Sequence, residues 1–416
     1  MQTKYDWNYL RVAALAGLFF LPFLGGVHLF DWDEINFAES SREMLETGDY
    51  LRPQINYEPF WEKPPLFMWF QAFSMHIFGV SDYAARFPNA VCGISTLLII
   101  YHIGKKLYNP TFGWLWVLSY FGSILPHLYF RSGIIDPWFN LFIFLSLLFL
   151  IENNNENNGK NNEQKAAKST PSVFPASNGH LAIGGLFLGL AILTKGPAAY
   201  VIVSFTWFVK LLIYKELSWI KIKNYALLST VALLTTSLWF GVEILKNGFW
   251  FLQTFIDYNI RLAQTEDSGH GGFIGYHFVV ILFGCFPASI FAVRAFIQKR
   301  SLNAENQDFT RWMKVLFWVV IILFSLVESK IVHYSSMCYL PLTFLSALTL
   351  KSMLEAGLFS PFLKKIIIGM GLFFGIIFAA VPFIGQRIDL LKPLFAKDAF
   401  ALKNLEANVQ WTGWES

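Results

Sequence analysis

The sequence predicts an all-α, polytopic membrane protein of about eleven spanning helices, with further helices lying along its outer face. Two observations support this prediction. First, 55% of the 416 residues are hydrophobic and only 14% are charged, which is more apolar surface than a soluble domain can bury. Second, the apolar residues gather in long, nearly uncharged runs, and runs of about 18 or more such residues are typical of spanning helices.

The predicted spans follow one another along the chain. The first run, 12–30, is too long for a removable signal peptide and lacks a small-residue cleavage site, so we interpret it as the first span. Several later runs are short, and their helices must extend into charged flanks. These later runs lie at 87–104, 107–130, 137–151, 181–194, 197–209, 225–242, 273–293, 315–327, 331–350 and 366–386.

The distribution of positive charge predicts the orientation. If the N-terminus is cytoplasmic and the spans alternate in direction, the lysines and arginines gather in cytoplasmic loops, as the positive-inside rule requires. The acidic segment 31–83, the loop 246–272 and the tail after residue 386 then lie on the outer face. The cytoplasmic loops contain Lys105, Lys106, Lys160, Lys165, Lys168, Lys210, Lys215, Lys221, Lys223, Lys299, Arg300, Arg311, Lys351, Lys364 and Lys365.

We expect one transmembrane domain over residues 1–386. Within it, the Asn-rich stretch 152–178 cannot bury a core and is predicted to be a disordered cytoplasmic linker. The outer tail, 387–416, is polar and mixed, and it is interpreted as the possible start of a truncated soluble domain. The three cysteines all fall within apolar runs, which predicts packed thiols without a disulfide framework or a metal cluster.

The outer segment 31–83 is unusually acidic for a chain with so few charges. An unpaired carboxylate beside a membrane is costly, so this segment is where chemistry is expected. The acidic residues that stand out are Asp31, Asp33, Glu34, Glu39, Glu43, Glu46, Asp49, Glu58 and Glu62.

Two interfacial helices are predicted in this segment. Asp33 is placed to cap a helix that begins near Glu34 and stops at Gly48, with Ile35, Ala38, Arg42 and Leu45 at helical spacing. Residues 65–78 are predicted to form the second helix. A purely structural interpretation stays open: Asp33 as a cap only, Lys63 as a snorkelling lysine, and Glu43, Glu46 and Glu58 as solvated surface.

The order of these residues resembles a known signature. The matching residues are Asp33-Glu34, Phe37-Ala38-Glu39, Arg42-Glu43-Met44-Leu45 and Gly48-Asp49, then Phe60-Trp61-Glu62-Lys63-Pro64-Pro65 and Ala85-Arg86-Phe87-Pro88. Together they resemble the polyprenyl-phosphate-sugar glycosyltransferases of the C-type membrane fold. That family includes the protein O-mannosyltransferases and the bacterial aminoarabinose transferases that modify lipid A.

The resemblance implies an inverting glycosyltransferase in the inner membrane, with its active site on the periplasmic face. The donor would be an undecaprenyl-phosphate-linked sugar, and the acceptor lipid A, another envelope glycan or a protein. The attacking hydroxyl needs a carboxylate as general base, and the leaving lipid phosphate needs cations and hydrogen-bond donors. The sequence shows no nucleotide-binding glycine loop, which fits a lipid-linked donor, and no nucleic acid partner is expected.

The resemblance also assigns roles to residues. Asp33 matches the general base and Asp136 the second acidic residue of the site, although Asp136 could equally cap its own helix. Lys63 matches the phosphate-binding lysine. Lys195 is expected to hold the donor, with interfacial snorkelling as the alternative. The substrate-binding residues expected in all are Lys63, Glu34, Lys195, Arg261, Tyr334 and His270.

The chain departs from the aminoarabinose transferases at several site positions. Those enzymes carry an Arg-Tyr pair where this chain has Asn36-Phe37, and a tyrosine at the place of Phe60. They bind zinc through a glutamate matching Glu62 and a histidine whose place here is taken by Tyr258 or a neighbour. The closest histidine is His270, and a lone Glu62 and His270 are a weak metal signal, so zinc is left open and no cofactor is predicted with certainty.

A lipid-linked glycan flippase or secondary transporter is the alternative function. Such proteins place charges at mid-membrane and often contain inverted repeats. Here the predicted spans are nearly free of acids at mid-depth, and the charges gather at one interface. This distribution favours an interfacial enzyme.

Overall fold

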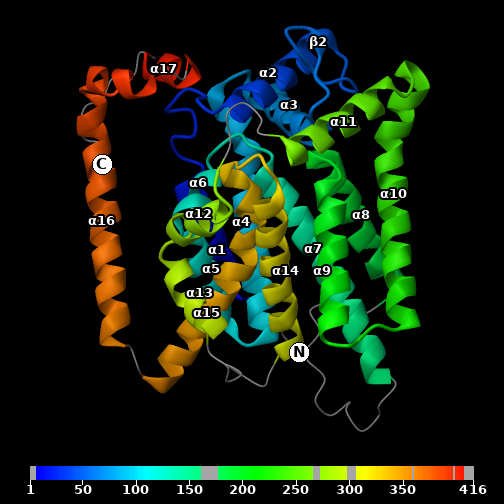
Figure 1. Cartoon of the computed structure of the whole chain (residues 1–416), viewed down its shortest axis with the longest axis vertical. Coiled ribbons are helices and arrows are strands. Elements are labelled where there is room, and N and C mark those ends of the chain that lie inside the picture. The colour runs from blue at the N-terminus through cyan, green and yellow to red at the C-terminus, as the bar shows by residue number, and fades with distance from the viewer. Residues whose placement is uncertain are drawn as a thin grey trace.

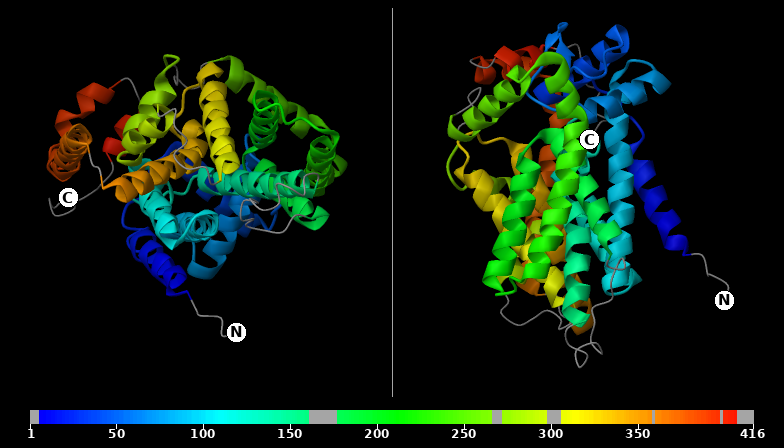
Figure 2. Two further views of the ribbon diagram at one scale, coloured as in Figure 1. Left: turned by 90° about the horizontal axis from the view of Figure 1, so that it is seen from below. Right: turned by 90° about the vertical axis from the view of Figure 1, so that its right-hand side faces the viewer.

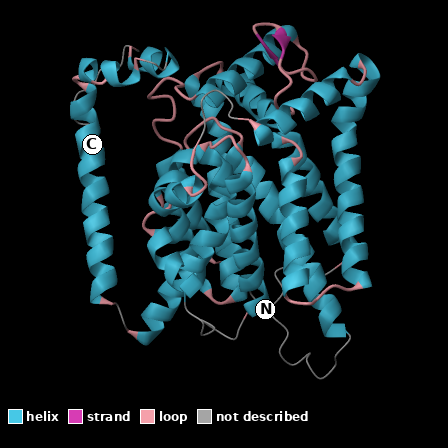
Figure 3. Cartoon of the chain, viewed as in Figure 1, coloured by secondary structure: helices cyan, strands magenta, loops and turns pink. Residues whose placement is uncertain are grey.

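The computed structural model describes residues 6–160, 177–265, 272–297, 306–357, 360–396 and 399–406. Long helices run side by side as a bundle, and shorter helices lie across one of its ends (Figures 1 and 2). Figure 3 shows that the described residues are almost entirely helical, apart from one small hairpin. The predicted all-α membrane fold is therefore confirmed.

The first half of the chain supplies the core of the bundle and part of its cover. Its elements are α1 (Trp7–Phe20), α2 (Trp32–Thr47), β1 (Gln54–Ile55), β2 (Glu58–Pro59), α3 (Leu66–Phe78), α4 (Asp82–Leu107), α5 (Pro110–Phe121), α6 (Ile124–Tyr129), α7 (Asp136–Lys160) and α8 (Asn178–Lys195).

The second half completes the bundle and adds a peripheral helix. Its elements are α9 (Ala198–Ile213), α10 (Trp219–Asn247), α11 (Trp250–Gln264), α12 (Tyr276–Gly284), α13 (Ala288–Ile297), α14 (Gln307–Leu326), the 3₁₀ helix η2 (Val332–Cys338), α15 (Tyr339–Ala356), α16 (Pro361–Gly385), the 3₁₀ helices η3 (Ile388–Leu390) and η4 (Lys392–Phe395), and α17 (Ala399–Leu405).

Six segments in the described residues are long and apolar enough to cross a membrane. They are α4, residues 136–154 of α7, α10, α14, the continuous segment Val332–Ala356, and α16. These segments differ in their surroundings: 89% of the apolar window in α7 is buried, against 6% in α16, which stands at the edge of the bundle (Figure 2). The total of eleven spans stays a prediction.

Two of the predicted spans are broken in the structure. The run 107–130 forms α5 and α6, which are separated at Gly122 and Ser123, and Ser123 donates from Oγ to the carbonyl of Ser119 at 2.7 Å. The run 273–293 forms α12 and α13, which are separated by a cis Phe286–Pro287 peptide bond. Apolar composition could not reveal either break, because turn residues can interrupt an apolar run without adding charge.

The segments predicted to share the outer face do share one end of the bundle. Figure 1 shows α2, α3, α11 and α17 together at the top, and the N-terminal end of the chain at the opposite end. The carboxamide of Asn404 donates to the carbonyl of Phe30 at 3.0 Å, and the rings of Trp32 and Phe400 lie 5.4 Å apart, so α17 contacts the start of α2. We call this end the site end.

The predicted linker 152–178 is partly helical. Helix α7 continues to Lys160, and the side chains of Glu152, Asn153 and Asn154 are buried. Asn224 of α10 donates its amide to the side-chain oxygens of Asn153 and Asn154, at 2.9 and 3.3 Å. These hydrogen bonds hold Asn153 and Asn154 against α10, so disorder is wrong for residues 152–154, and residues 155–160 continue the helix. Residues 161–176 lie outside the described residues.

The first interfacial helix differs from its prediction in cap and face. Asp31 caps α2, because its Oδ1 accepts from the backbone N–H of Asp33 at 3.0 Å; Asp33 was wrongly expected in that role. The predicted stop at Gly48 is confirmed, with Gly48 in the left-handed region at φ 73°. The buried face contains Glu34, Phe37, Ala38, Ser40, Ser41, Glu43 and Met44.

The loop between α2 and α3 is held against the bundle by two indole groups. Trp69 of α3 donates to the carbonyl of Tyr50 at 2.5 Å, and Trp239 of α10 donates to the carbonyl of Leu51 at 2.9 Å. The hairpin β1–β2 then turns through Asn56 and Tyr57, both with positive φ. These contacts deliver the following residues, including Lys63, to the site end.

Candidate active site

Asp33 lies in the first turn of α2 and is partly exposed. Since Asp31 supplies the cap, the Asp33 side chain is not used for capping. The Asp33 Oδ2 atom lies 3.7 Å from Nε2 of His333, which reaches it from η2. A carboxylate at the rim of the bundle is thus available for proton transfer.

Asp136 begins α7 and forms a short ion pair. Its Oδ1 lies 2.6 Å from Nζ of Lys195, which ends α8, and it accepts from the hydroxyl of Ser336 at 3.3 Å. Asn140, one turn along α7, donates to that same hydroxyl at 2.9 Å. The side chains of the pair are only 2% and 11% exposed, so the charges compensate one another in a poorly solvated place. Lys195 therefore does not snorkel.

Lys195 also contacts the ring of Tyr334. Its Nζ lies 5.2 Å from the centroid of that ring, which η2 holds directly beside His333. The rings of His333 and Tyr334 are 5.4 Å apart. Consequently, the predicted residues Asp33, Asp136, Lys195 and Tyr334 come together around η2, although 301 positions separate the first from the last.

Tyr258 of α11 joins the remaining predicted cations. The Lys63 Nζ atom lies 4.9 Å from the centroid of the Tyr258 ring, and the guanidinium carbon of Arg261 lies 5.3 Å from it. The Tyr258 hydroxyl donates to Oε2 of Glu62 at 2.9 Å. Two cations and a carboxylate therefore share one aromatic ring, an arrangement that can receive an anion.

Electrostatic interactions link the two groups of residues. Burial lowers the pKa of the Lys63 ammonium below its ordinary value, and the carboxylates of Asp33, Glu62 and Asp136 oppose that shift. Lys195 acts in the same direction as burial because it carries the same charge as Lys63. The site is thus a patch in which acids and cations stand close enough to set one another's charge.

Glu34 occupies a different environment from the one expected. Its carboxylate is fully buried and forms a bidentate pair with Arg86 of α4, at 2.7 and 2.9 Å. Its oxygens also accept from the backbone N–H groups of Gly133, at 2.6 Å, and Phe30, at 3.3 Å. These partners occupy both carboxylate oxygens, which favours a structural role over substrate binding.

Three other expectations for the segment change with the structure. Glu43 was expected to be solvated but is 1% exposed, and its Oε2 accepts from the N–H of Tyr57 at 2.9 Å. Phe37 packs in the core against Phe67, with ring centroids 5.9 Å apart. The position where the relatives carry a tyrosine is therefore a packed interior in this chain. Phe60 packs against the same cluster. The expected exposure of Glu46 and Glu58 is confirmed.

Of the two residues considered for zinc, the structure describes Glu62 but not His270. His270 lies outside the described residues. Within them, no group of three or more histidine, cysteine, aspartate or glutamate side chains is arranged to hold a metal ion. Glu62 is hydrogen-bonded to Tyr258, so a phenol stands beside the carboxylate that a metal would need.

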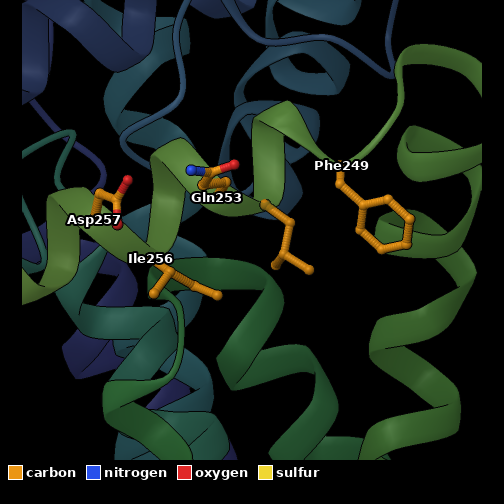
Figure 4. Close-up of a pocket in the computed structure, with 5 residues that line it drawn as sticks. Phe249, Gln253, Ile256 and Asp257 are labelled. Carbon is orange, nitrogen blue, oxygen red and sulfur yellow. The ribbon is translucent and has the colours of Figure 1, made fainter.

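A shallow, largely apolar groove of about 240 Å³ runs along α11, next to the site. Phe249, Leu252, Gln253, Ile256 and Asp257 line it. Figure 4 shows Phe249 at the turn before the helix, with Ile256 and Asp257 directed to opposite sides of its ribbon. Such an amphipathic helix is typical of the membrane interface, where its apolar side faces lipid.

Two residues of the site were not identified from the sequence. His333 directly precedes Tyr334 in the sequence, but neither spacing nor charge indicated that it faces Asp33. Tyr258 was noted only as the place of a missing histidine, whereas its ring organises Lys63 and Arg261. Both depend on contacts between distant segments. No local pattern in a single sequence reports such contacts.

Comparison with known proteins gives consistent similarities. Residues 62–161 match a family model described as dolichyl-phosphate-mannose-protein mannosyltransferase. An undecaprenyl phosphate-alpha-4-amino-4-deoxy-L-arabinose arabinosyl transferase of Pectobacterium atrosepticum is 23% identical over 415 residues, which cover 97% of this chain and 69% of that protein. An uncharacterized protein of Aquifex aeolicus is 27% identical over 354 residues, covering 84% of this chain and 74% of that protein.

The solved structures agree on the architecture. The crystal structure of ArnT from Cupriavidus metallidurans bound to undecaprenyl phosphate superposes with a TM-score of 0.75 at 19% identity, covering 97% of this chain and 72% of that one. The same protein in the apo state gives a TM-score of 0.66 at 18% identity. These similarities extend over nearly the whole chain.

Proposed function

We propose that this chain, a C-type glycosyltransferase of the polyprenyl-phosphate-sugar family, moves a sugar from a lipid phosphate to an acceptor hydroxyl at the membrane surface. The observation that carries the proposal is the site end itself. There the carboxylate of Asp33 stands at a helix N-terminus, beside a buried acid–lysine pair and a tyrosine flanked by two cations.

The donor is proposed to be an undecaprenyl-phosphate-linked sugar. Support comes from the similarity to transferases named for that donor and to a structure with undecaprenyl phosphate bound. Lipid A, another envelope glycan or a protein is the proposed acceptor. The proposed location is the inner membrane, with the site end on the periplasmic face, as the positive charges of the opposite loops favour.

The reaction is a single displacement. Asp33 takes the proton of the acceptor hydroxyl as its oxygen bonds to the anomeric carbon. The bond from that carbon to the phosphate oxygen breaks, and its electron pair leaves with the lipid phosphate. Attack from the face opposite the leaving group inverts the anomeric configuration. Carboxylate bases of this kind contribute about 10²- to 10⁴-fold to rate.

The cations are proposed to receive the leaving phosphate. Lys63 and Arg261 flank Tyr258, so an anion beside that ring would meet both charges. Lys195 is held by Asp136 and is proposed to contact the donor together with Tyr334. Asp136 in turn is proposed to orient the acceptor, because its Oδ2 is buried and has no hydrogen-bond partner among the described residues.

A direct assay tests this function. Purified protein in lipid nanodiscs is given radiolabelled undecaprenyl-phosphate-sugar and an acceptor, and the release of free lipid phosphate is measured together with sugar transfer. The wild type is expected to produce both. Asp33→Asn should lose them, while Asp389→Asn, a change at a site-end carboxylate that is 85% exposed, should keep them.

Two outcomes would contradict the proposal. Unchanged turnover in a folded Asp33→Asn protein would exclude Asp33 as the base. Movement of the labelled lipid between leaflets, without release of lipid phosphate, would instead indicate the flippase or transporter function. A thermal unfolding curve for each variant separates lost activity from lost folding.

A further inference from the structure

His333 lies next to the proposed base although no local pattern points to it. Its side chain is 13% exposed, and its Nε2 atom lies 3.7 Å from Oδ2 of Asp33. In the described part of the chain, no lysine or arginine side chain approaches that carboxylate within ion-pair distance. The imidazole is therefore placed to influence the orientation of the Asp33 carboxylate.

The groups around His333 come from four elements. Asp31 and Asp33 at the start of α2, Asp136 of α7 and Lys195 of α8 interact with it electrostatically. His277 of α12 also lies near it. With three carboxylates and one lysine nearby, the local net charge is negative. An imidazole N–H at this place therefore has carboxylate oxygens to which it can donate.

The backbone of η2 holds the imidazole in place. Ser336, one turn further along η2, hydrogen-bonds to both Asp136 and Asn140 of α7, at 3.3 and 2.9 Å. Before η2, the hydroxyl of Ser329 donates to the carbonyl of Thr265 at 2.8 Å, next to the end of α11. η2 is thus fixed to α7 on one side and to the end of α11 on the other.

We propose that His333 is a positioning residue for Asp33: its neutral imidazole donates from Nε2 to the carboxylate and fixes which oxygen faces the acceptor. This inference rests on the proposed role of Asp33 as the base. The separation of 3.7 Å is longer than a hydrogen bond, and such contacts commonly shorten when substrate closes a site. Protonation would convert the donor into a cation that pairs with Asp33 and lowers its basicity.

The variants His333→Ala and His333→Gln separate this role from simple packing. Alanine removes the donor, so kcat should fall by about 10- to 100-fold while the donor KM stays within about 2-fold. Glutamine can place an amide N–H where Nε2 stands, so it should retain most of kcat at alkaline pH. The glutamine side chain does not titrate. In this variant the decrease of kcat at acidic pH, the acid limb, should therefore begin at a lower pH than in the wild type.

A second measurement does not depend on turnover. The infrared carboxylate band of Asp33, identified as the band lost in Asp33→Asn, should shift in His333→Ala and keep its wild-type position in His333→Gln at alkaline pH. His28→Ala provides the control, because His28 is 82% exposed and pairs with Asp82 at the same end of the bundle. It should leave both the band and kcat unchanged.

The outcomes are distinct. An alanine variant with wild-type kcat and an unshifted band would overturn the inference. So would a glutamine variant that is as defective as alanine and keeps the wild-type acid limb, because that pattern indicates packing alone. A fully active Asp33→Asn protein would exclude Asp33 as the base, and the His333 inference would fail with it, whereas the proposed sugar transfer would stand. Absence of transfer in the wild type would contradict the proposed function itself.

Discussion

Glu34 and Arg86 form a buried bidentate ion pair that joins α2 to α4, with Oε1 2.7 Å from Nε and Oε2 2.9 Å from Nη2. The two side chains are 0% and 4% exposed. Arg86 also fixes the chain between α1 and α2, since its remaining N–H groups donate to three backbone carbonyls, those of Leu24, Val27 and His28. The pair therefore sets the position of the helix that carries Asp33.

Breaking this pair should destabilise the protein strongly. Glu34→Ala leaves the Arg86 guanidinium buried without its carboxylate, and losses of this kind cost about 3–5 kcal/mol. We expect a lower midpoint of thermal unfolding in detergent and poor recovery of folded protein. Glu34→Gln keeps the shape and one acceptor, so its midpoint should fall between those of the wild type and Glu34→Ala. Glu58→Ala, at an exposed acid of the same segment, should unfold like the wild type.

The pair Lys195–Asp136 allows a double-mutant cycle. Lys195→Met leaves Asp136 buried beside Ser336 without its cation, and Asp136→Asn leaves Lys195 without its carboxylate, so each change alone should lower the unfolding midpoint. The double variant should lose less than the sum of the two, by about 1–3 kcal/mol of coupling. Strict additivity of the two effects would indicate that the 2.6 Å contact contributes nothing to stability.

Deprotonation of Lys63 should make the activity fall at alkaline pH, which gives the pH profile an alkaline limb. Burial lowers the pKa of its ammonium below the ordinary lysine value of 10.5, and only the protonated form attracts a phosphate. As pH rises through that lowered pKa, kcat/KM for the donor should fall. A bound phosphate favours the charged form, so the limb in kcat should lie at higher pH than the limb in kcat/KM.

The variant Lys63→Arg checks the assignment of that limb. A guanidinium stays charged throughout the accessible pH range, so the alkaline limb should disappear even where the overall rate is reduced. The measurement is a pH profile of initial rates at limiting and saturating donor. A limb that persists unchanged in the arginine variant would assign it to another group.

Gly196 should be intolerant of a side chain for reasons of geometry. It has φ +97°, and a Cβ there would lie 2.6 Å from Cζ of Phe255 on α11. Gly196→Ala therefore adds backbone strain of about 1–2 kcal/mol and pushes on the helix that carries Tyr258 and Arg261. We expect a lower unfolding midpoint and a raised donor KM.

A matched glycine provides the control for this change. Gly241 lies inside α10, and no neighbouring atom stands within 4 Å of the place that a Cβ would take, so Gly241→Ala should be neutral or slightly stabilising. In the double variant Gly196→Ala with Phe255→Leu, the shorter side chain should relieve the contact, and the donor KM should recover in part. Equal unfolding midpoints for the two glycine variants would contradict the argument.

The sequence predicted the local features of the outer segment well where local rules apply. The stop of α2 at Gly48 and the helix at 66–78 depend on left-handed backbone and on Pro64-Pro65, which neighbours in sequence report. The cap was misplaced by two residues because Asp31 and Asp33 both suit that position. Only the geometry of the entering chain selects Asp31, whose Oδ1 reaches the N–H of Asp33.

The candidate site was predictable only in part, for a related reason. Charge next to apolar runs and the motif order singled out Asp33, Lys63, Asp136 and Lys195. The same reasoning could not distinguish Glu34 from Asp33. Adjacent positions on a helix point in different directions, but only the partner of the helix decides which of them is buried. In the folded protein Glu34 is turned to Arg86 of α4, and Asp33 stays at the rim.

By itself the sequence determined the membrane-spanning helical architecture, because long uncharged runs can satisfy their backbone hydrogen bonds in lipid only as helices. It also determined that the acids of segment 31–83 gather at one end of the bundle. The tertiary structure alone decided which of them are paired, which are buried and which meet His333 and Tyr258. Those contacts join α2, α7, α8, α11 and η2, and the pairing of a charge depends on neighbours that only folding brings within a few ångströms.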